Sequence, residues 1–308
     1  GSEPEGMRPY PDRYSILMHA ETNRKLKEYT AGLRDNTTTP GHYLKREIDN
    51  GFAHILNPDV VLQLLLRSKK PRIFAESELK GDGSDWNRQE LSILGDIAVA
   101  VPVDIFDDGR HNSPNVHGSP FGGTLLFVPG ALLAGGTGTL PADWSEVVSG
   151  NKIDEQAYDS LYMRRLLPVL KFASADALRR GKKALITVPG LGCGMFAGQF
   201  RGLLQERLAK SLERILSSCH REIPGVRMVW YDPYQGCKGF EATLGHIEYR
   251  VRPLTEGGKP QLCRPVDYQE AEENLSDCRL YSIVAWDHVS WPGNDYYDGA
   301  RSTDDGVK

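Results

Sequence analysis

The sequence predicts an α/β protein in which helices cover both faces of a mainly parallel sheet, preceded by a helical extension. Short apolar and β-branched runs alternate with longer helical patterns over the last three quarters of the chain. A clear amphipathic helix separates two of these runs. The order strand, helix, strand indicates parallel neighbouring strands, because the helix returns the chain across one face of the sheet.

Length and composition indicate a soluble globular protein. The chain has 308 residues, 40% of them hydrophobic and 25% charged. No apolar run approaches the roughly 18–20 residues of a membrane span, so we expect no membrane partner. A net charge of -4 lacks the positive excess typical of nucleic-acid binders, and we therefore assign no nucleic-acid partner.

The cysteines indicate a reducing compartment. Five of them, at positions 193, 219, 237, 263 and 278, form neither a C-x-x-C pair nor a Cys/His cluster with zinc spacing. The stretch up to Pro11 lacks the charged start and apolar core of a signal peptide. We expect a cytoplasmic protein without a bound metal, although a secreted effector that acts in a host cytosol would have the same features.

The first 80 residues are predicted to form the helical extension. Ile16, Leu17 and residues 19–29 suggest one helix. Asn57 followed by Pro58 suits the capped start of a second helix, with proline in its first turn. The glycine-rich loop at 81–85 then separates the extension, residues 1–80, from a catalytic domain over residues 81–308.

The second domain shows six strand-like runs and two longer helical patterns. One helix carries Leu204, Leu208 and Leu212 along a single stripe, and another is expected over residues 160–180. The strands are predicted at Ile97–Val103, Thr124–Val128, Ala184–Val188, Val226–Tyr231, Ile247–Val251 and Leu280–Trp286.

A glycine-rich loop, P-G-L-G-C-G-M-F-A-G over residues 189–198, joins the strand at 184–188 to the helix that contains Leu204. Glycines let backbone N–H groups approach phosphate oxygens, and the N-terminus of a following helix favours negative charge. The pattern predicts an anion cradle. A tight turn without a ligand is the alternative, and a dinucleotide-binding fingerprint would also place glycines after a strand.

This loop resembles the second ligand loop of macrodomains, in which glycines wrap the diphosphate of ADP-ribose and an aromatic side chain lies beside the distal ribose. The resemblance implies an ADP-ribose site. Its ligand-binding residues would be Gly190, Gly192, Cys193, Gly194, Met195, Phe196 and Ala197. Cys193 could instead be a nucleophile, but the sequence shows no partner histidine, and a small buried thiol is the simpler interpretation.

A second segment, W-D-H-V-S-W-P-G-N-D from residue 286, follows the last predicted strand and leads to T-D-D-G-V-K at the end of the sequence. Ligands of open α/β sheets gather at the carboxyl ends of strands, where Asp287 is expected. Carboxylates there can stabilise an oxocarbenium-like transition state or activate water. Alternatives are loop-capping aspartates or a calcium site, although a twelve-residue calcium loop is absent.

This segment resembles the MavL class of arginine-specific macrodomain ADP-ribosylhydrolases. The resemblance implies a macrodomain-like three-layer α/β/α sandwich with a mixed, mostly parallel sheet. It places the catalytic carboxylates at Asp287, Asp295 and Asp305, with Asn294 beside ADP-ribose. The implied reaction removes mono-ADP-ribose from arginine side chains of a protein, with ubiquitin as one candidate substrate, and needs no cofactor.

Two other functions stay open on the sequence. A non-catalytic ADP-ribose reader would carry the same glycine loop, and an NAD-dependent oxidoreductase would use a similar one. One further site is also open, because Asp104, Phe106, Asp107 and Asp108 could include an adenine contact or form a plain strand-end turn. Asp232 follows the next strand after the glycine loop but is not a convincing ribose-binding acid of a dinucleotide enzyme.

Overall fold

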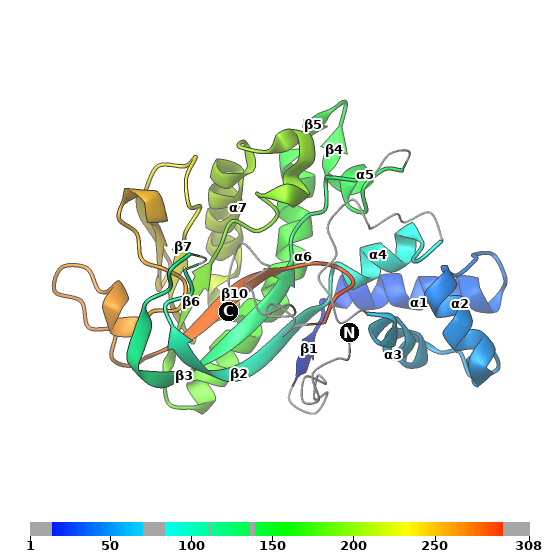
Figure 1. The fold of residues 1–308 in the computed structure, drawn as a ribbon, viewed down its shortest axis with the longest axis horizontal. Coiled ribbons are helices and arrows are strands. Elements are labelled where there is room, and N and C mark those ends of the chain that lie inside the picture. Colours follow the sequence, from blue (N-terminus) through cyan, green and yellow to red (C-terminus); the bar gives the residue numbers. More distant parts are fainter. Residues whose placement is uncertain (1–13, 70–83, 111, 136–138, 292–308) are drawn as a thin grey trace.

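The computed structural model describes residues 14–69, 84–110, 112–135 and 139–291. Figure 1 shows a central twisted sheet with long helices on one face and a group of shorter helices at one end. The eight strands run in the order β1-β2-β3-β10-β6-β7-β9-β8. They span Ser15–Leu17 (β1), Ala98–Asp107 (β2), Val116–Pro129 (β3), Lys183–Val188 (β6), Val226–Tyr231 (β7), Phe240–Leu244 (β8), Ile247–Val251 (β9) and Cys278–Trp286 (β10).

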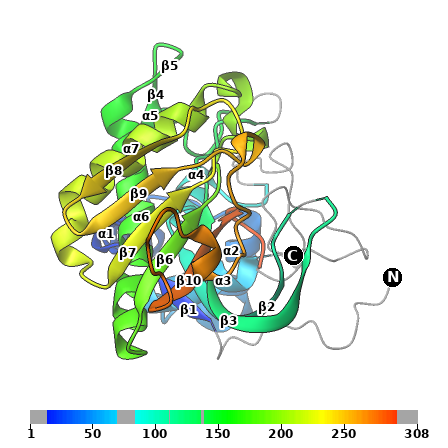
Figure 2. The same cartoon turned by 90° about the vertical axis from the view of Figure 1, so that its left-hand side faces the viewer.

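The middle of the sheet is parallel and its two edges are antiparallel. Strands β3, β10, β6, β7 and β9 pair in parallel, whereas β1 with β2, β2 with β3, and β8 with β9 pair antiparallel. The last strand, β10, is inserted between β3 and β6 (Figure 2). The predicted mixed, mostly parallel α/β architecture is confirmed.

Two long helices cover one face of the sheet. Helix α6 (Glu155–Arg179) is capped by Asp154, whose carboxylate accepts the Ala157 N–H at 2.9 Å, and it continues through Pro168. Helix α7 (Leu204–Cys219) buries Leu204, Leu208, Leu212, Ile215 and Leu216, as its sequence stripe predicted. Residues at alternate positions of β6, among them Ile186 and Val188, complete this core.

The opposite face is covered differently. Leu185, Met228, Trp230 and Leu280 face a second core, which Leu262 and other residues of the segment 252–278 complete. In the described part of this layer the helices are short 3-10 turns, Leu254–Glu256 and Pro265–Tyr268.

The N-terminal helices pack together at one end of the sheet. They are α1 (Ala20–Arg34), α2 (His42–Glu47), which continues into a π-helical turn at Ile48–Phe52, α3 (Pro58–Ser68) and α4 (Arg88–Leu94). Asn57 caps α3 by accepting the Val60 N–H at 3.0 Å, as predicted. Their shared core reaches Ile97, Leu132 and Val289, which lie outside these helices.

Three details differ from the prediction. Helices were expected on both faces of the sheet, but in the described residues the second face is covered by loops and 3-10 turns. Ile16 and Leu17, which were expected in the first helix, form β1 with Ser15 instead, because β2 offers them an open sheet edge. Helix α1 begins only after His19, whose Nδ1 accepts the Glu21 N–H at 3.0 Å. The predicted boundary near residue 80 stays a prediction.

Short elements complete the description. Helix α5 (Trp144–Val147) leads into a small hairpin, β4 (Val148–Ser149) with β5 (Lys152–Ile153), and 3-10 turns lie at Met195–Phe200 and His220–Glu222. None of the helices in the described ranges has the length and hydrophobicity needed to cross a lipid bilayer.

Candidate active site

The predicted site residues that the structure describes lie at one edge of the sheet, where the parallel strands have their carboxyl ends. Because β3, β10, β6 and β7 are parallel, their carboxyl ends lie side by side, with Trp286 paired to Pro129 and Val188 to Tyr231. Three described segments leave this edge: residues 130–135 after β3, 189–203 after β6 and 287–291 after β10. The tertiary structure therefore brings the glycine loop close to the start of the acidic segment.

The backbone of the glycine loop has a conformation at Gly192 that only glycine adopts without strain. Gly192 has φ of 65°, and a Cβ there would lie 2.8 Å from Tyr162 Oη. Gly194, by contrast, has open space where a Cβ would project, and Met195 is 52% exposed. The exposed part of the loop can therefore offer its backbone to an anion.

The seven loop residues predicted to bind ADP-ribose differ in their exposure to solvent. Gly194 and Met195 are exposed, and Gly190 and Phe196 are partly buried. Gly192, Cys193 and Ala197 are buried. The Cys193 thiol is 5% exposed and donates to Leu191 O at 3.5 Å, so it packs inside the loop and does not face solvent as a nucleophile would.

The segment after β3 packs against the glycine loop and is hydrogen-bonded to it. A Cβ on Gly130 would lie 2.5 Å from the backbone nitrogen of Gly192. The Tyr162 hydroxyl accepts the Ala131 N–H at 3.0 Å and donates to Leu191 O at 2.9 Å. Leu133 N–H donates to Phe196 O at 2.8 Å. These contacts fix the loop to a rigid strand end.

Asp287 organises the turn that follows β10. It is 3% exposed. Its Oδ1 accepts the N–H groups of Val289 and Ser290, both at 2.7 Å, and its Oδ2 accepts the Ser290 hydroxyl at 2.6 Å. Among the described residues, both carboxylate oxygens are thus engaged within the turn. The other predicted residues of this segment, Asn294, Asp295 and Asp305, lie outside the described ranges.

A buried ion network that the sequence analysis missed anchors the same turn. His288 is fully buried, and its Nε2 lies 3.1 Å from Asp143 Oδ2. Asp143 also accepts the Leu132 N–H at 2.7 Å and Arg165 Nη2 at 2.7 Å. Burial alone would raise the pKa of Asp143, but the charge of Arg165 and the contact with His288 outweigh it and hold that pKa far below its usual value.

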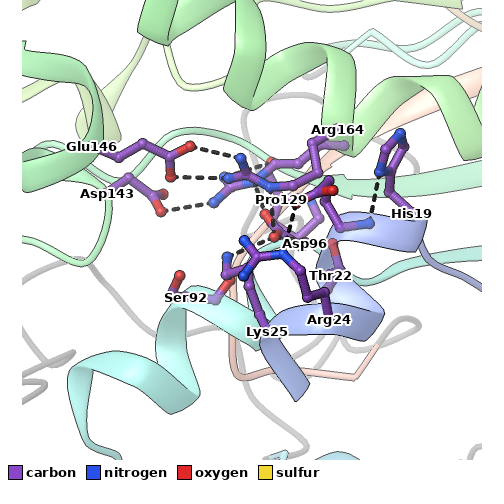
Figure 3. Close-up of polar contacts among 12 residues, drawn as sticks. His19, Thr22, Arg24, Lys25, Ser92, Asp96, Pro129, Asp143, Glu146 and Arg164 are labelled. Atoms are coloured by element: carbon purple, nitrogen blue, oxygen red, sulfur yellow. Dashed lines mark hydrogen bonds and ion pairs between the residues drawn. The ribbon is translucent and has the colours of Figure 1, made fainter. Parts of the chain in front are cut away.

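The network continues to the N-terminal helices through Asp96 (Figure 3). Arg165 Nε donates to Asp96 Oδ1 at 3.1 Å, and Arg164 Nε and Lys25 Nζ lie 2.7 and 2.8 Å from Oδ2. Arg165 occupies the apolar stripe of α6 between Leu161 and Val169. A charged residue in such a stripe was the available signal for this network, because an arginine there must find buried partners.

The glycine loop touches this turn directly. The rings of Phe196 and His288 have centroids 6.2 Å apart. A Cβ on Gly95, at the end of α4, would lie 2.6 Å from His288 Nε2. The imidazole is therefore enclosed between the glycine loop and the N-terminal helices, next to Asp287.

Residues 104–108 lie away from this edge. Asp104 pairs with Gly122 of β3, seven residues before Pro129, or roughly 23 Å along the strand. Asp108 accepts the Arg110 and Asn115 N–H groups in the hairpin loop. These contacts favour the alternative of a strand-end turn, and the adenine contact stays an untested prediction.

Asp232, at the end of β7, is a buried carboxylate whose ionisation is unfavourable. Its Oδ1 accepts the N–H groups of Tyr234 and Leu254 at 2.7 and 2.8 Å. Burial nevertheless raises its pKa to about 6. The ordinary value is about 3.9, so the folded protein holds a proton that the unfolded chain releases between pH 4 and pH 6.

Replacing Asp232 with asparagine is therefore expected to stabilise the protein at neutral pH. Because the pKa of Asp232 is higher in the folded protein than in the unfolded chain, the protonated carboxyl stabilises the fold below about pH 4. This stabilisation is lost as the pH rises through 6. Asparagine keeps the acceptor oxygen without the charge, so we expect about 1–2 kcal/mol more unfolding free energy at pH 7.5 and no gain at pH 4. Urea unfolding at both pH values measures this. Asp35→Asn, at the exposed end of α1, is the control, and an equal gain at both pH values would refute the assignment.

The described residues contain no cluster of three or more His, Cys, Asp or Glu side chains suited to a metal ion. What they do contain is a solvent-exposed stretch of glycine-loop backbone and a buried, ion-paired turn beginning at Asp287. An exposed glycine-loop backbone thus lies at the same edge of the sheet as buried carboxylates.

The comparisons with known proteins agree with this geometry. No curated protein matches the chain. One family, described as macrodomain effector MavL, matches residues 14–308, which include both the N-terminal helices and the sheet. A macrodomain family accounts for the α/β fold and for a glycine loop at the carboxyl edge of a parallel sheet. The chain therefore belongs to the MavL family of macrodomain effectors, and its function is related to ADP-ribose.

Proposed function

We propose that the protein is an ADP-ribosylarginine hydrolase, which removes mono-ADP-ribose from arginine side chains of a protein substrate. One observation carries the proposal: the glycine loop and the segment that starts at Asp287 share an edge of the sheet, where the rings of Phe196 and His288 lie 6.2 Å apart. A diphosphate held by the loop would direct its distal ribose toward the carboxylates of that segment.

The chemistry requires these two parts together. Water attacks C1″ of the ribose, the C1″–N bond to the guanidine breaks, and free ADP-ribose and an unmodified arginine result. The transition state carries positive charge on the sugar, which carboxylates stabilise, and a carboxylate can also accept the proton of the attacking water. The planar guanidinium of the leaving group favours acidic partners as well. Asp287, Asp295 and Asp305 are the proposed carboxylates, with Asn294 beside the ligand.

A turnover assay separates this proposal from a reader function. The protein is incubated with a peptide that is mono-ADP-ribosylated on arginine, and released ADP-ribose is measured. A peptide modified on serine is the linkage control, and ADP-ribosylated ubiquitin tests one candidate substrate. Binding of ADP-ribose without release from arginine would establish a reader and refute the hydrolase. Alanine replacement of Asp295 or Asp305 should lower release while ADP-ribose affinity changes little.

Membership in a macrodomain family argues against the oxidoreductase alternative. Calorimetry with NAD and with ADP-ribose tests this directly, since an oxidoreductase would prefer NAD. We place the reaction in the cytosol of the producing cell or of a host. No disulfide joins any of the five cysteines, which are all buried, and this suits a reducing compartment.

Replacing Gly130 with alanine is expected to weaken ADP-ribose binding at least about tenfold. The added Cβ would lie 2.5 Å from Gly192 N and 2.8 Å from Gly192 Cα, and backbone atoms cannot move aside as a flexible side chain would. The glycine loop must therefore shift from its position. Calorimetry with ADP-ribose gives the change in Kd.

The matched control is Gly118→Ala, near the start of β3 and far from Gly130, where a Cβ would have no neighbour within 4 Å. Its affinity should equal that of the wild type. If Gly130→Ala binds ADP-ribose within twofold of wild type, the glycine loop is not the diphosphate site.

A further inference from the structure

Lys69 connects the N-terminal helices to the turn that contains Asp287. It is the capping residue that follows α3, and it is only 4% exposed. Its Nζ donates to the carbonyl of His288 at 2.9 Å and lies 4.1 Å from the ring centroid of Trp286. One ammonium group thus contacts the residues on both sides of Asp287, more than 200 positions away in sequence.

Burying the charged Lys69 ammonium group at this position is energetically unfavourable. Burial lowers the pKa of Lys69 to about 7, although the attraction of the Asp287 carboxylate acts in the opposite direction. An apolar side chain of similar length would fill the same space without this cost. What the ammonium adds is a hydrogen bond to a backbone carbonyl, a cation–π contact and an attraction to Asp287.

Within the described residues, the contacts of the Lys69 side chain lie in one half of the site. The described partners of its side chain belong to β10 and the turn after it, whereas the glycine loop is held by Gly130, Tyr162 and Leu133. A change at Lys69 should therefore act on the acidic segment and leave the diphosphate cradle in place.

We propose that Lys69 is a positioning residue for hydrolysis, which fixes the Asp287 turn through the His288 carbonyl and the Trp286 ring. The proposal rests on the function proposed above. It makes the N-terminal helices part of the machinery of turnover, because the residue that follows α3 supplies the charge that orders a carboxylate just after the last strand. Lys69 itself need not touch the substrate.

Two substitutions test this role. Lys69→Met keeps the length and removes the charge, and Lys69→Arg keeps a cation. With the arginine-modified peptide, we expect Lys69→Met to lower kcat at least about tenfold while KM and the Kd for ADP-ribose stay within about twofold. Lys69→Arg should recover at least a third of the wild-type kcat. Lys45→Met is the matched control, because Lys45 lies on exposed α2 and pairs only with Asp49 among the contacts described.

A spectroscopic readout is independent of activity. In ¹H–¹⁵N spectra, the amides of Val289 and Ser290 and the indole N–H of Trp286 report the turn, since they donate to Asp287 and to the Ser290 hydroxyl. These resonances should shift in Lys69→Met and stay near their wild-type positions in Lys69→Arg and Lys45→Met.

The outcomes are distinct. An unchanged kcat in Lys69→Met, or losses of kcat and ADP-ribose affinity in equal proportion, would overturn the proposal. If Lys69→Met fails to fold, Lys69→Arg carries the test, and a kcat below a third of wild type with unshifted turn resonances overturns it. If the wild type releases no ADP-ribose at all, the hydrolase proposal fails, and the spectra still decide whether Lys69 orders the turn.

Discussion

Replacing Arg165 with methionine is expected to lower the free energy of unfolding by about 3–5 kcal/mol. The guanidinium is 1% exposed and lies between two buried carboxylates, Asp96 and Asp143, at 3.1 and 2.7 Å. It also donates to the carbonyls of Pro129 and Gly130. Its removal leaves both acids without their main counter-charge and frees the end of β3.

Chemical unfolding monitored by tryptophan fluorescence measures this loss. Arg24→Met is the control, because Arg24 pairs with Glu21 and Glu28 at an exposed helix surface, and such pairs contribute roughly 0.2–1 kcal/mol. A loss below about 1 kcal/mol for Arg165→Met would show that the network is not the anchor inferred here. Burial raises the pKa of Asp96, and Arg165, Lys25 and Arg164 together lower it; because the variant loses the first of these charges, it should also unfold at a higher pH on acid titration.

Replacing Asp287 with asparagine is expected to lower turnover of ADP-ribosylarginine by at least about 100-fold. Asparagine can keep the acceptor for the Val289 and Ser290 N–H groups, and the Ser290 hydroxyl can rotate to accept from the new amide. The turn is therefore retained while its negative charge is lost. The affinity for free ADP-ribose should change by less than about threefold, because the glycine loop is untouched.

The control for this variant is Asp108→Asn, which alters a second buried carboxylate that accepts two backbone N–H groups, at the opposite edge of the sheet. It should leave both turnover and ADP-ribose affinity unchanged. A turnover within fivefold of wild type for Asp287→Asn, with the fold intact, would restrict Asp287 to holding the turn and shift the catalytic role to Asp295 and Asp305.

Much of the sheet was predictable because its strands are buried on both faces. The run Val226–Tyr231 is apolar except for Arg227, and Ile247–Val251 has apolar residues at alternate positions. The two runs match β7 and β9 at both ends. The edge strands were harder. In β8, exposed and partly buried positions alternate, and β1 has only three residues, so neither carries the pattern of a buried strand.

The sequence predicted the glycine loop and the acidic segment, but it did not predict which residues from other elements contact them. The glycine loop follows a strand and precedes a helix in sequence, so its place at the carboxyl edge of β6 could be inferred locally. The partners of the Asp287 turn could not. Asp143, Arg165 and Lys69 come from three different elements, and no spacing in the sequence relates them to residue 287.

The sequence by itself thus determined the fold class, the glycine loop and the identity of the acidic segment, because periodicity and local motifs are properties of contiguous residues. Only the tertiary structure decided that β10 inserts between β3 and β6 and carries Asp287 to the glycine loop. It also decided which charges surround that turn. Buried charges must be paired, and their partners are set by packing between distant elements, which local sequence does not encode.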